Sequence, residues 1–203
     1  MKKIIIFIIL IVSILSFAHV PFFHVKDDNN IFIDDIYLSQ IHYYEFTDNH
    51  KKIEFNFFVK NEENLYILLG VPKIYRLNNF NFEIKITDVN ENTIDIFDTL
   101  ELKPEEMYEP FGDTYSWQYL RYDKSLPEGM YKVVLTSNQK GKAWIAFGKR
   151  EEFTLEQILS LPVMIQDIRN FHELEGIATW EKYALGISST LFSILVLLLL
   201  KKK

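Results

Sequence analysis

The sequence of 203 residues contains no cysteine. Disulfide bonds, thiol catalysis and cysteine-based zinc sites are therefore excluded, and a folded domain must be held together by its hydrophobic core. The sequence also lacks an internal repeat, a low-complexity linker, the serine context of a nucleophile elbow and the His-x-x-x-His spacing of a metal-binding helix. These absences favour a single domain without catalytic activity.

Basic residues are scarce in the middle of the chain. Five of the 22 Lys and Arg residues lie within residues 1–3 and 201–203, so residues 19–182 hold 17 basic against 28 acidic residues, a net charge of −11. An acidic surface repels phosphate backbones, which makes nucleic acid an unexpected partner. The same charge disfavours contact with anionic lipid headgroups and predicts that the domain stands away from the bilayer.

The N-terminal end is apolar. Residues 1–18 have the layout of a secretory signal peptide, with two lysines followed by an uncharged apolar stretch. Small residues at Ser16 and Ala18 predict cleavage before His19. The alternative is an uncleaved anchor that continues as far as Phe23.

The C-terminal end is also apolar. Residues 183–200 carry no charge, and as a helix they would reach about 27 Å, enough to span a hydrocarbon core. Trp180 and Tyr183 occupy the position of an aromatic belt, and residues 201–203 are lysines typical of a cytoplasmic tail. We therefore expect a transmembrane helix and a single-pass protein of the cell membrane, with the domain outside the cytoplasm.

Period-two alternation dominates the region between these ends. Apolar residues alternate with polar ones in residues 52–60 and 80–87, and two further alternating segments, 130–136 and 142–148, flank a turn-rich loop. Additional strands are expected at residues 36–46, 65–71, 93–97 and 114–122. Many short strands without intervening helices predict a mainly β fold, an antiparallel β-sandwich of the jelly-roll or immunoglobulin-like kind over residues 30–150.

Helical periodicity begins only after residue 150. Thr154 and Gln157 have the spacing of a capping box, and Pro162 is expected to restart the chain. We interpret residues 151–177 as a short helical stalk that either packs on the sandwich or lies at the membrane surface. Gly176 is expected to end it.

Two pairs of strands resemble a known family. Residues 126–135 with 141–148, a Gly-x-Tyr strand followed by a glycine turn and a final strand, resemble the closing hairpin of secreted bacterial and archaeal β-sandwich modules of the pre-peptidase C-terminal type. Residues 41–46 with 53–57 resemble their opening pair. The resemblance implies a β-sandwich and an accessory role beside proteases, and it assigns no functional residue to this chain.

An aromatic cluster is the main candidate for ligand binding. Tyr115, Trp117 and Tyr119 are predicted to lie on one face of a strand, with Tyr122 close behind. Such rings can stack on sugars, or they can fill the core of a sandwich. Our first hypothesis is a noncatalytic ectodomain that binds a protein or surface partner in the cell envelope, and the alternative is a membrane-tethered glycan-binding module.

Two groups of residues offer oxygen or nitrogen donors for a metal ion. The turn that begins at Asp88 places oxygen-bearing side chains at alternate positions, like the start of an EF-hand loop, but Thr93 and Thr99 replace the required glycine and glutamate. Cleavage before His19 would expose an amine that could bind copper with His24 or His42. Neither pattern is complete, so we expect no metal and no cofactor.

Overall fold

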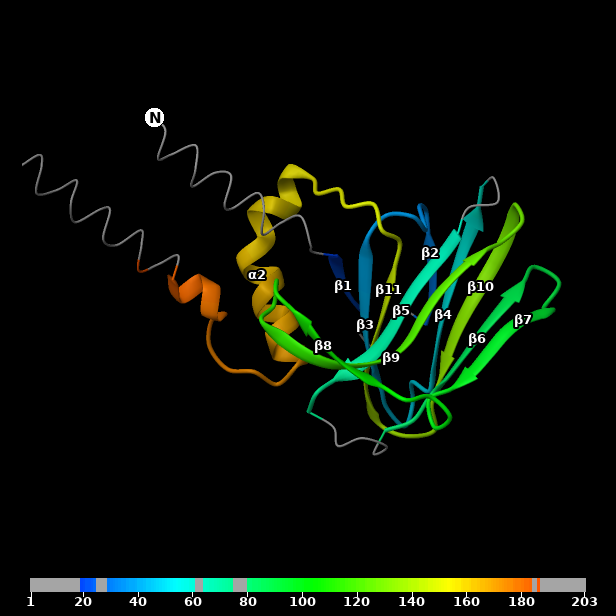
Figure 1. Cartoon of the computed structure of the whole chain (residues 1–203), viewed down its shortest axis with the longest axis horizontal. Coiled ribbons are helices and arrows are strands. Elements are labelled where there is room, and N and C mark those ends of the chain that lie inside the picture. Colours follow the sequence, from blue (N-terminus) through cyan, green and yellow to red (C-terminus); the bar gives the residue numbers. More distant parts are fainter. Residues whose placement is uncertain (1–18, 25–28, 61–63, 75–79, 184–185, 187–203) are drawn as a thin grey trace, which may run out of the picture.

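The computed structural model describes residues 19–24, 29–60, 64–74, 80–183 and 186 (Figure 1). Within these ranges the chain forms strands and one long helix, and is mainly β as predicted. The elements are β1 (Val20–His24), β2 (Asn30–Ile33), β3 (Gln40–Phe46), β4 (Lys52–Val59), β5 (Asn64–Pro72), β6 (Glu83–Asp88), β7 (Thr93–Asp98), β8 (Glu105–Glu109), β9 (Thr114–Ser125), β10 (Gly129–Thr136), β11 (Gly141–Phe147) and α2 (Leu155–Phe171).

Two sheets form a sandwich. One has the strand order β1-β3-β11-β5-β9-β8 and the other the order β2-β4-β10-β6-β7. The prediction of an antiparallel sandwich is wrong at one edge of each sheet, because β1 runs parallel to β3 and β2 runs parallel to β4. Alternation reports which face of a strand is buried and carries no information about strand direction, so these parallel pairs could not be predicted from it.

The core between the sheets follows the predicted alternation. Phe55, Phe57 and Val59 of β4 are completely buried, and β6 contributes Ile84 and Ile86 to the same core. The polar residues between them point to the outer side of the five-stranded sheet, as expected for strands with one buried face.

The outer face of the six-stranded sheet is covered by α2 (Figure 1). Ile165 and Ile168 of the helix belong to one buried cluster with sheet residues that include Tyr43, Leu68 and Trp144. The six-stranded sheet is thus buried on both faces along β3, β5 and β11. Of the two placements expected for residues 151–177, the structure shows the helix packed on the sandwich.

The helix begins as predicted but does not restart at Pro162. Thr154 accepts a hydrogen bond from the Gln157 backbone N–H at 3.2 Å, and the Gln157 side chain accepts one from the Thr154 N–H at 2.8 Å, which completes the capping box. Pro162 lies inside one continuous helix. Burial of Ile165 and Ile168 against the sheet stabilises the second half of the helix despite the missing proline donor.

The predicted membrane segments fall almost entirely outside the described residues. This applies to residues 1–18 and to residues 184–203 apart from Gly186. The suggestion that an anchor continues through Phe23 is wrong, because Val20 to His24 form a strand paired with β3. Within the described ranges, no helix has the length and apolar character needed to cross a membrane.

Candidate functional site

The structure separates the four aromatic residues proposed as a platform on β9. Tyr115 is 49% exposed and Trp117 is half-buried, whereas Tyr119 and Tyr122 are buried in the core between the sheets. Of the four rings, Tyr115 therefore faces a surface that a ligand could reach, and Trp117 reaches that surface in part while it packs against the core. Tyr122 is instead held inside by its hydroxyl, which donates a hydrogen bond of 2.6 Å to Asp95 on β7.

A β-bulge interrupts the alternation of β9 at Tyr119. Leu69 of β5 pairs with Leu120, while the next residue, Gly70, pairs with Gln118, so Tyr119 is an extra residue without a partner in the ladder. Gly70 permits this close approach, because a Cβ there would lie 2.5 Å from the Trp117 carbonyl oxygen and from the Trp144 ring. Trp117 and Tyr119 both pack against the core between the sheets, and the shifted alternation beyond the bulge brings Leu120 and Tyr122 into the same core.

The exposed rings form a compact surface with one ion pair. We define the Lys73–Tyr115 surface as Lys73, Glu106, Tyr108, Tyr115 and Trp117. The Lys73 ammonium lies 5.6 Å from the centre of the Tyr115 ring and 5.0 Å from that of Trp117, within cation–π range. It also pairs with Glu106 at 2.5 Å, and the Tyr108 and Tyr115 rings lie 4.9 Å apart. The edge strand β8 thus presents aromatic and charged groups together.

A shallow hollow of about 290 Å³ adjoins this surface. It is lined by Lys73, Ile74, Glu106, Tyr115, His172 and Leu174. A larger hollow of about 480 Å³ lies at the far sheet, beside Lys51, Asp98 and Gln139, but presents no exposed aromatic ring. The smaller hollow combines an exposed ring with charged groups, which is the composition expected of a recognition site.

His172 lies in a buried hydrogen-bond chain beside the hollow. Its Nδ1–H donates to the Ile168 carbonyl at 2.9 Å, so Nε2 accepts from the Ser116 hydroxyl at 3.1 Å when the ring is neutral. Ser116 in turn accepts from the Trp144 indole N–H at 3.0 Å. Burial lowers the pKa of His172 to about 4, which keeps the ring neutral at pH 7.

This Ser–His contact has a structural role. The Ser116 side chain belongs to a residue only 2% exposed, so its hydroxyl cannot meet a substrate in this arrangement. The imidazole is oriented by a backbone carbonyl instead of a carboxylate. The chain of bonds joins α2 to β9 and β11 and satisfies three buried polar groups.

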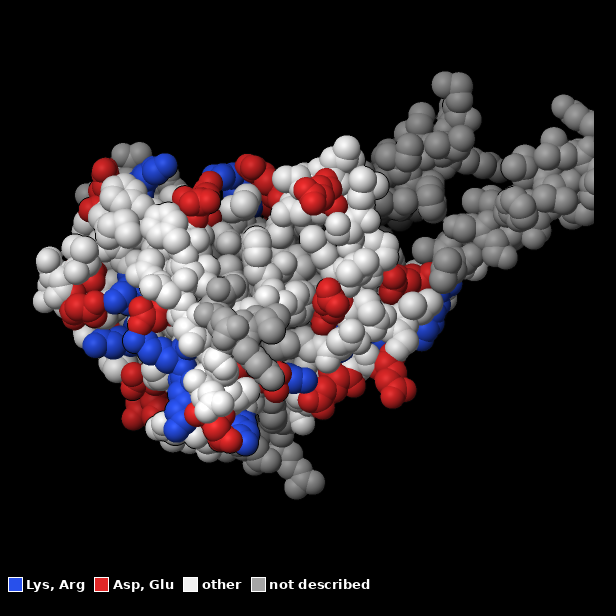
Figure 2. All heavy atoms as spheres, turned by 180° about the vertical axis from the view of Figure 1, so that it is seen from behind, with Lys and Arg blue, Asp and Glu red and all other residues white. Residues whose placement is uncertain are grey.

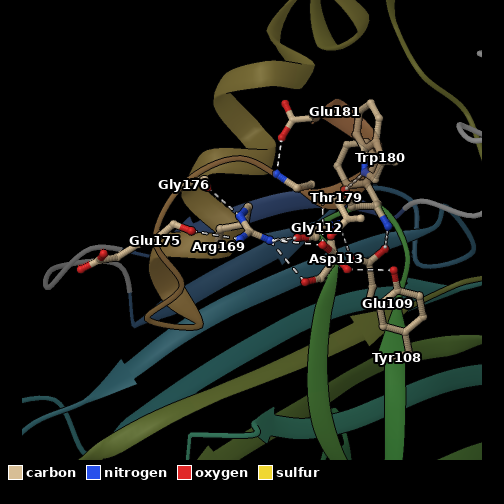
Figure 3. Close-up of polar contacts among 12 residues, drawn as sticks. Tyr108, Glu109, Gly112, Asp113, Arg169, Glu175, Gly176, Thr179, Trp180 and Glu181 are labelled. Atoms are coloured by element: carbon tan, nitrogen blue, oxygen red, sulfur yellow. Dashed lines mark hydrogen bonds and ion pairs between the residues drawn. The ribbon is translucent and has the colours of Figure 1, made fainter. Parts of the chain in front are cut away.

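Arg169 is the centre of a second buried network, shown in Figure 3. Its guanidinium donates to the carbonyl of Gly176 at 2.8 Å, of Gly112 at 3.0 Å and of Glu175 at 3.2 Å. Gly112 belongs to the turn between β8 and β9, whereas Glu175 and Gly176 follow α2. One side chain therefore ties this turn to the segment after the helix, with the fork of donors that arginine provides.

Further bonds join the same turn to Thr179 and Trp180 (Figure 3). The Thr179 N–H donates to Asp113 at 2.8 Å, and the Trp180 indole N–H donates to the Phe111 carbonyl at 3.1 Å. Hydrogen bonds from Thr179 lower the pKa of Asp113. Trp180, predicted as part of a membrane belt, is thus half-buried against the sandwich.

Glu109 stabilises the turn between β8 and β9 through hydrogen bonds to its backbone. Its carboxylate accepts from the backbone N–H groups of Phe111 at 2.8 Å and Gly112 at 2.7 Å. Burial nevertheless raises the pKa of Glu109. Burial, together with the hydrogen bond to Asp113, also raises the pKa of Tyr108 to about 12, so this hydroxyl remains protonated at neutral pH.

The histidines considered as copper ligands lie in two separate contacts. His19 Nδ1 is 2.6 Å from the Ser39 hydroxyl, while His24 Nε2 is 2.7 Å from His42 Nδ1. Burial, and secondarily His24, lowers the pKa of His42 to about 3. In the part of the chain that the structure describes, no cluster of three or more metal-binding side chains is present.

The Asp88 turn is closed by its own hydrogen bonds. The carboxylate accepts from the backbone N–H groups of Asn90 at 2.8 Å and Asn92 at 2.9 Å. These bonds lower the pKa of Asp88, the largest contribution coming from the Asn92 side chain. The oxygens that an EF-hand would direct at calcium are used here to cap a hairpin turn.

Charges of both signs are interspersed over the face seen from behind in Figure 2, without a continuous basic region. Such mixing is typical of a solvated surface. It offers no extended track for a phosphate backbone on that face.

Comparison with known proteins gives one type of match. No protein-family model matches the chain, and no curated protein matches it. Among solved structures, it is similar to the pre-peptidase C-terminal domain of a collagenase from Bacillus anthracis. The two are 10% identical with a TM-score of 0.38, over 60% of this chain and 97% of that chain. The match is to the module type that the two strand pairs resemble, and no residue role is transferred from it.

Proposed function

We propose that this protein is a noncatalytic β-sandwich ectodomain, anchored in the cell membrane by residues 183–200, that binds a protein partner in the cell envelope. The Lys73–Tyr115 surface is the proposed contact. Of the jelly-roll and immunoglobulin-like alternatives, we propose the jelly roll, a choice supported by the alternation of consecutive strands β3, β4 and β5 between the two sheets.

The exposure of Tyr115 is the observation that carries this proposal. Its ring is half-exposed between Tyr108 and the Lys73 ammonium, on strands at the edge of a sheet. Exposed tyrosine and tryptophan beside a charged group are the residues that most often dominate binding energy in protein interfaces. The adjoining hollow provides a recess for a partner side chain.

A pair of matched variants tests the contact. Full-length protein in detergent is used to capture partners, together with Tyr115→Ala and the control Phe32→Ala, which removes an exposed ring from β2 on the other sheet. We expect loss of about 2 kcal/mol of binding for Tyr115→Ala, roughly a thirtyfold weaker complex, and none for Phe32→Ala. Equal capture by both variants would remove the Lys73–Tyr115 surface as the contact.

Glycan binding is the second candidate, and the pairing of a ring with a carboxylate favours it. The Tyr115 ring could stack on a sugar while Glu106 accepts hydrogen bonds from its hydroxyl groups, since both line the same hollow. Retention on immobilised polysaccharide tests this candidate. We expect retention to be lost in Tyr115→Ala and reduced in Glu106→Gln, and absence of retention for the unaltered protein at millimolar sugar would exclude a lectin.

A further inference from the structure

The first half of α2 exposes a line of large aliphatic side chains. Leu155, Leu159 and Val163 are 72%, 74% and 64% exposed, and their spacing of four residues places them on one side of the helix. We call these three residues the apolar stripe. Large aliphatic side chains normally face a core. A contiguous row of them on the surface marks a site that contacts a membrane or another protein.

The apolar stripe points away from the sandwich. The opposite side of α2 holds Ile165 and Ile168, which are buried against the six-stranded sheet. In Figure 1 the helix lies at one end of the molecule, with β6 and β7 at the other. Whatever covers the stripe must therefore approach the molecule from the α2 side.

The chain that leads to the proposed membrane span leaves from the same side and is short. Ala178 is completely buried, and Trp180 is bonded to the turn between β8 and β9. Two residues separate Trp180 from Tyr183, and the three steps along the chain span about 10 Å when fully extended and about 4.5 Å as a helix. A membrane span that begins at Tyr183 thus holds the α2 side of the domain close to the bilayer.

We propose that the apolar stripe lies in the interfacial region of a zwitterionic lipid bilayer and fixes the orientation of the sandwich on the membrane. This inference rests on the proposed membrane anchor. Exposed acidic residues at the start of the helix, Glu151, Glu152 and Glu156, oppose anionic lipid and favour a zwitterionic surface. The domain accordingly lies against the bilayer and does not stand away from it on a stalk.

The absence of cysteine makes a depth measurement straightforward. A single cysteine introduced by Leu159→Cys is labelled with an environment-sensitive fluorophore in the full-length protein, reconstituted in phosphatidylcholine nanodiscs. The matched control is Val89→Cys, at an equally exposed position in the turn between β6 and β7, far from α2. Each sample is exposed to iodide in the buffer or to nitroxide-labelled lipid.

We expect the probe at residue 159 to emit at shorter wavelength and to be quenched several-fold more strongly by the lipid nitroxide than the probe at residue 89. The control probe should respond to iodide alone. Quenching at residue 159 by iodide alone would overturn the inference. Protection from both quenchers would also overturn it, because a second copy or residues 4–17 would then cover the stripe.

Failure of the anchor can be distinguished from failure of the inference. Membranes containing the full-length protein are washed at alkaline pH, which removes peripheral proteins but not integral ones. Release of the protein would overturn the proposed anchor and the inference with it. Retention, combined with a water-exposed probe at residue 159, would overturn only the inference about α2.

Discussion

The outer faces of the two sheets are built in different ways. On the five-stranded sheet, β4 and, from Met130 onward, β10 alternate between buried and accessible residues, because one face meets water. On the six-stranded sheet, β3 and β11 are buried almost throughout, because α2 covers the second face. Unbroken burial along a strand therefore signals a covering layer, whereas alternation signals a bare face.

The polar groups differ in the same way. The outer face of the six-stranded sheet, here called the covered face, holds Arg169, His172 and Ser116 in buried hydrogen bonds. The outer face of the five-stranded sheet, here called the bare face, carries ion pairs that water reaches, such as the one between Lys132 and Glu91 at 2.7 Å. Buried polar groups lose much more than exposed ones when a partner is removed, so the covered face should be the more sensitive to mutation.

The largest effect is expected from Arg169→Ala. The carbonyls of Gly112, Glu175 and Gly176 would lose their donor, and the free energy of unfolding should fall by about 3 to 5 kcal/mol. Urea unfolding of this variant is compared with that of Arg121→Ala, an exposed arginine on β9 that should change stability by less than about 0.5 kcal/mol. Similar losses in both variants would show that burial does not set the cost of removing an arginine side chain.

The second largest effect is expected in the pH dependence of the free energy of unfolding. Burial lowers the pKa of His172 from 6.5 to about 4, so the unfolded chain binds a proton more readily than the folded one between these values. The stability contributed by the neutral ring is complete above pH 6.5 and is lost as the pH falls through 4, an amount of roughly 3 kcal/mol. His19 and His42, whose pKa values burial also lowers, act in the same direction.

A substitution separates the contribution of His172 to this pH-dependent loss of stability from that of the other histidines. Chemical unfolding measured from pH 7.5 to 4 should show a shallower loss of stability in His172→Gln than in the unaltered protein. An unchanged slope in His172→Gln would show that this ring titrates as it does in water.

The smallest effect is expected on the bare face. Lys132→Ala removes the ion pair with Glu91 and the longer contact with Glu54 at 3.9 Å, and the loss should be about 0.5 kcal/mol, because Glu91 is exposed to water, which screens the pair. Added salt should shrink the difference further. A loss above about 2 kcal/mol would mean that the bare face depends on polar contacts as strongly as the covered one.

The predictable part of the fold is the part governed by local periodicity. Alternation located β4 and β6 because each has one buried face, and the capping box located the start of α2. The edge strands β1, β2 and β8 were missed. They contain four or five residues each and pair at a sheet edge, so their sequence carries little of the period that identifies a longer strand.

The candidate site was predictable only in part. Tyr115 and Trp117 could be selected as aromatic residues on one strand face. The burial of Tyr122 on the same side as Tyr119 could not be predicted, because it depends on a bulge in the pairing of β5 with β9. The Arg169 network joins residues 57 positions apart, so no local pattern could reveal it.

The central claim is that residues 174–182 are folded against the sandwich and do not form a loose linker. Amide hydrogen exchange of the full-length protein in nanodiscs tests it most directly. The Leu174, Ala178 and Thr179 amides, each hydrogen-bonded in the structure, should exchange as slowly as amides within β9. Exchange as fast as in the loop at residues 138–140 would contradict the claim.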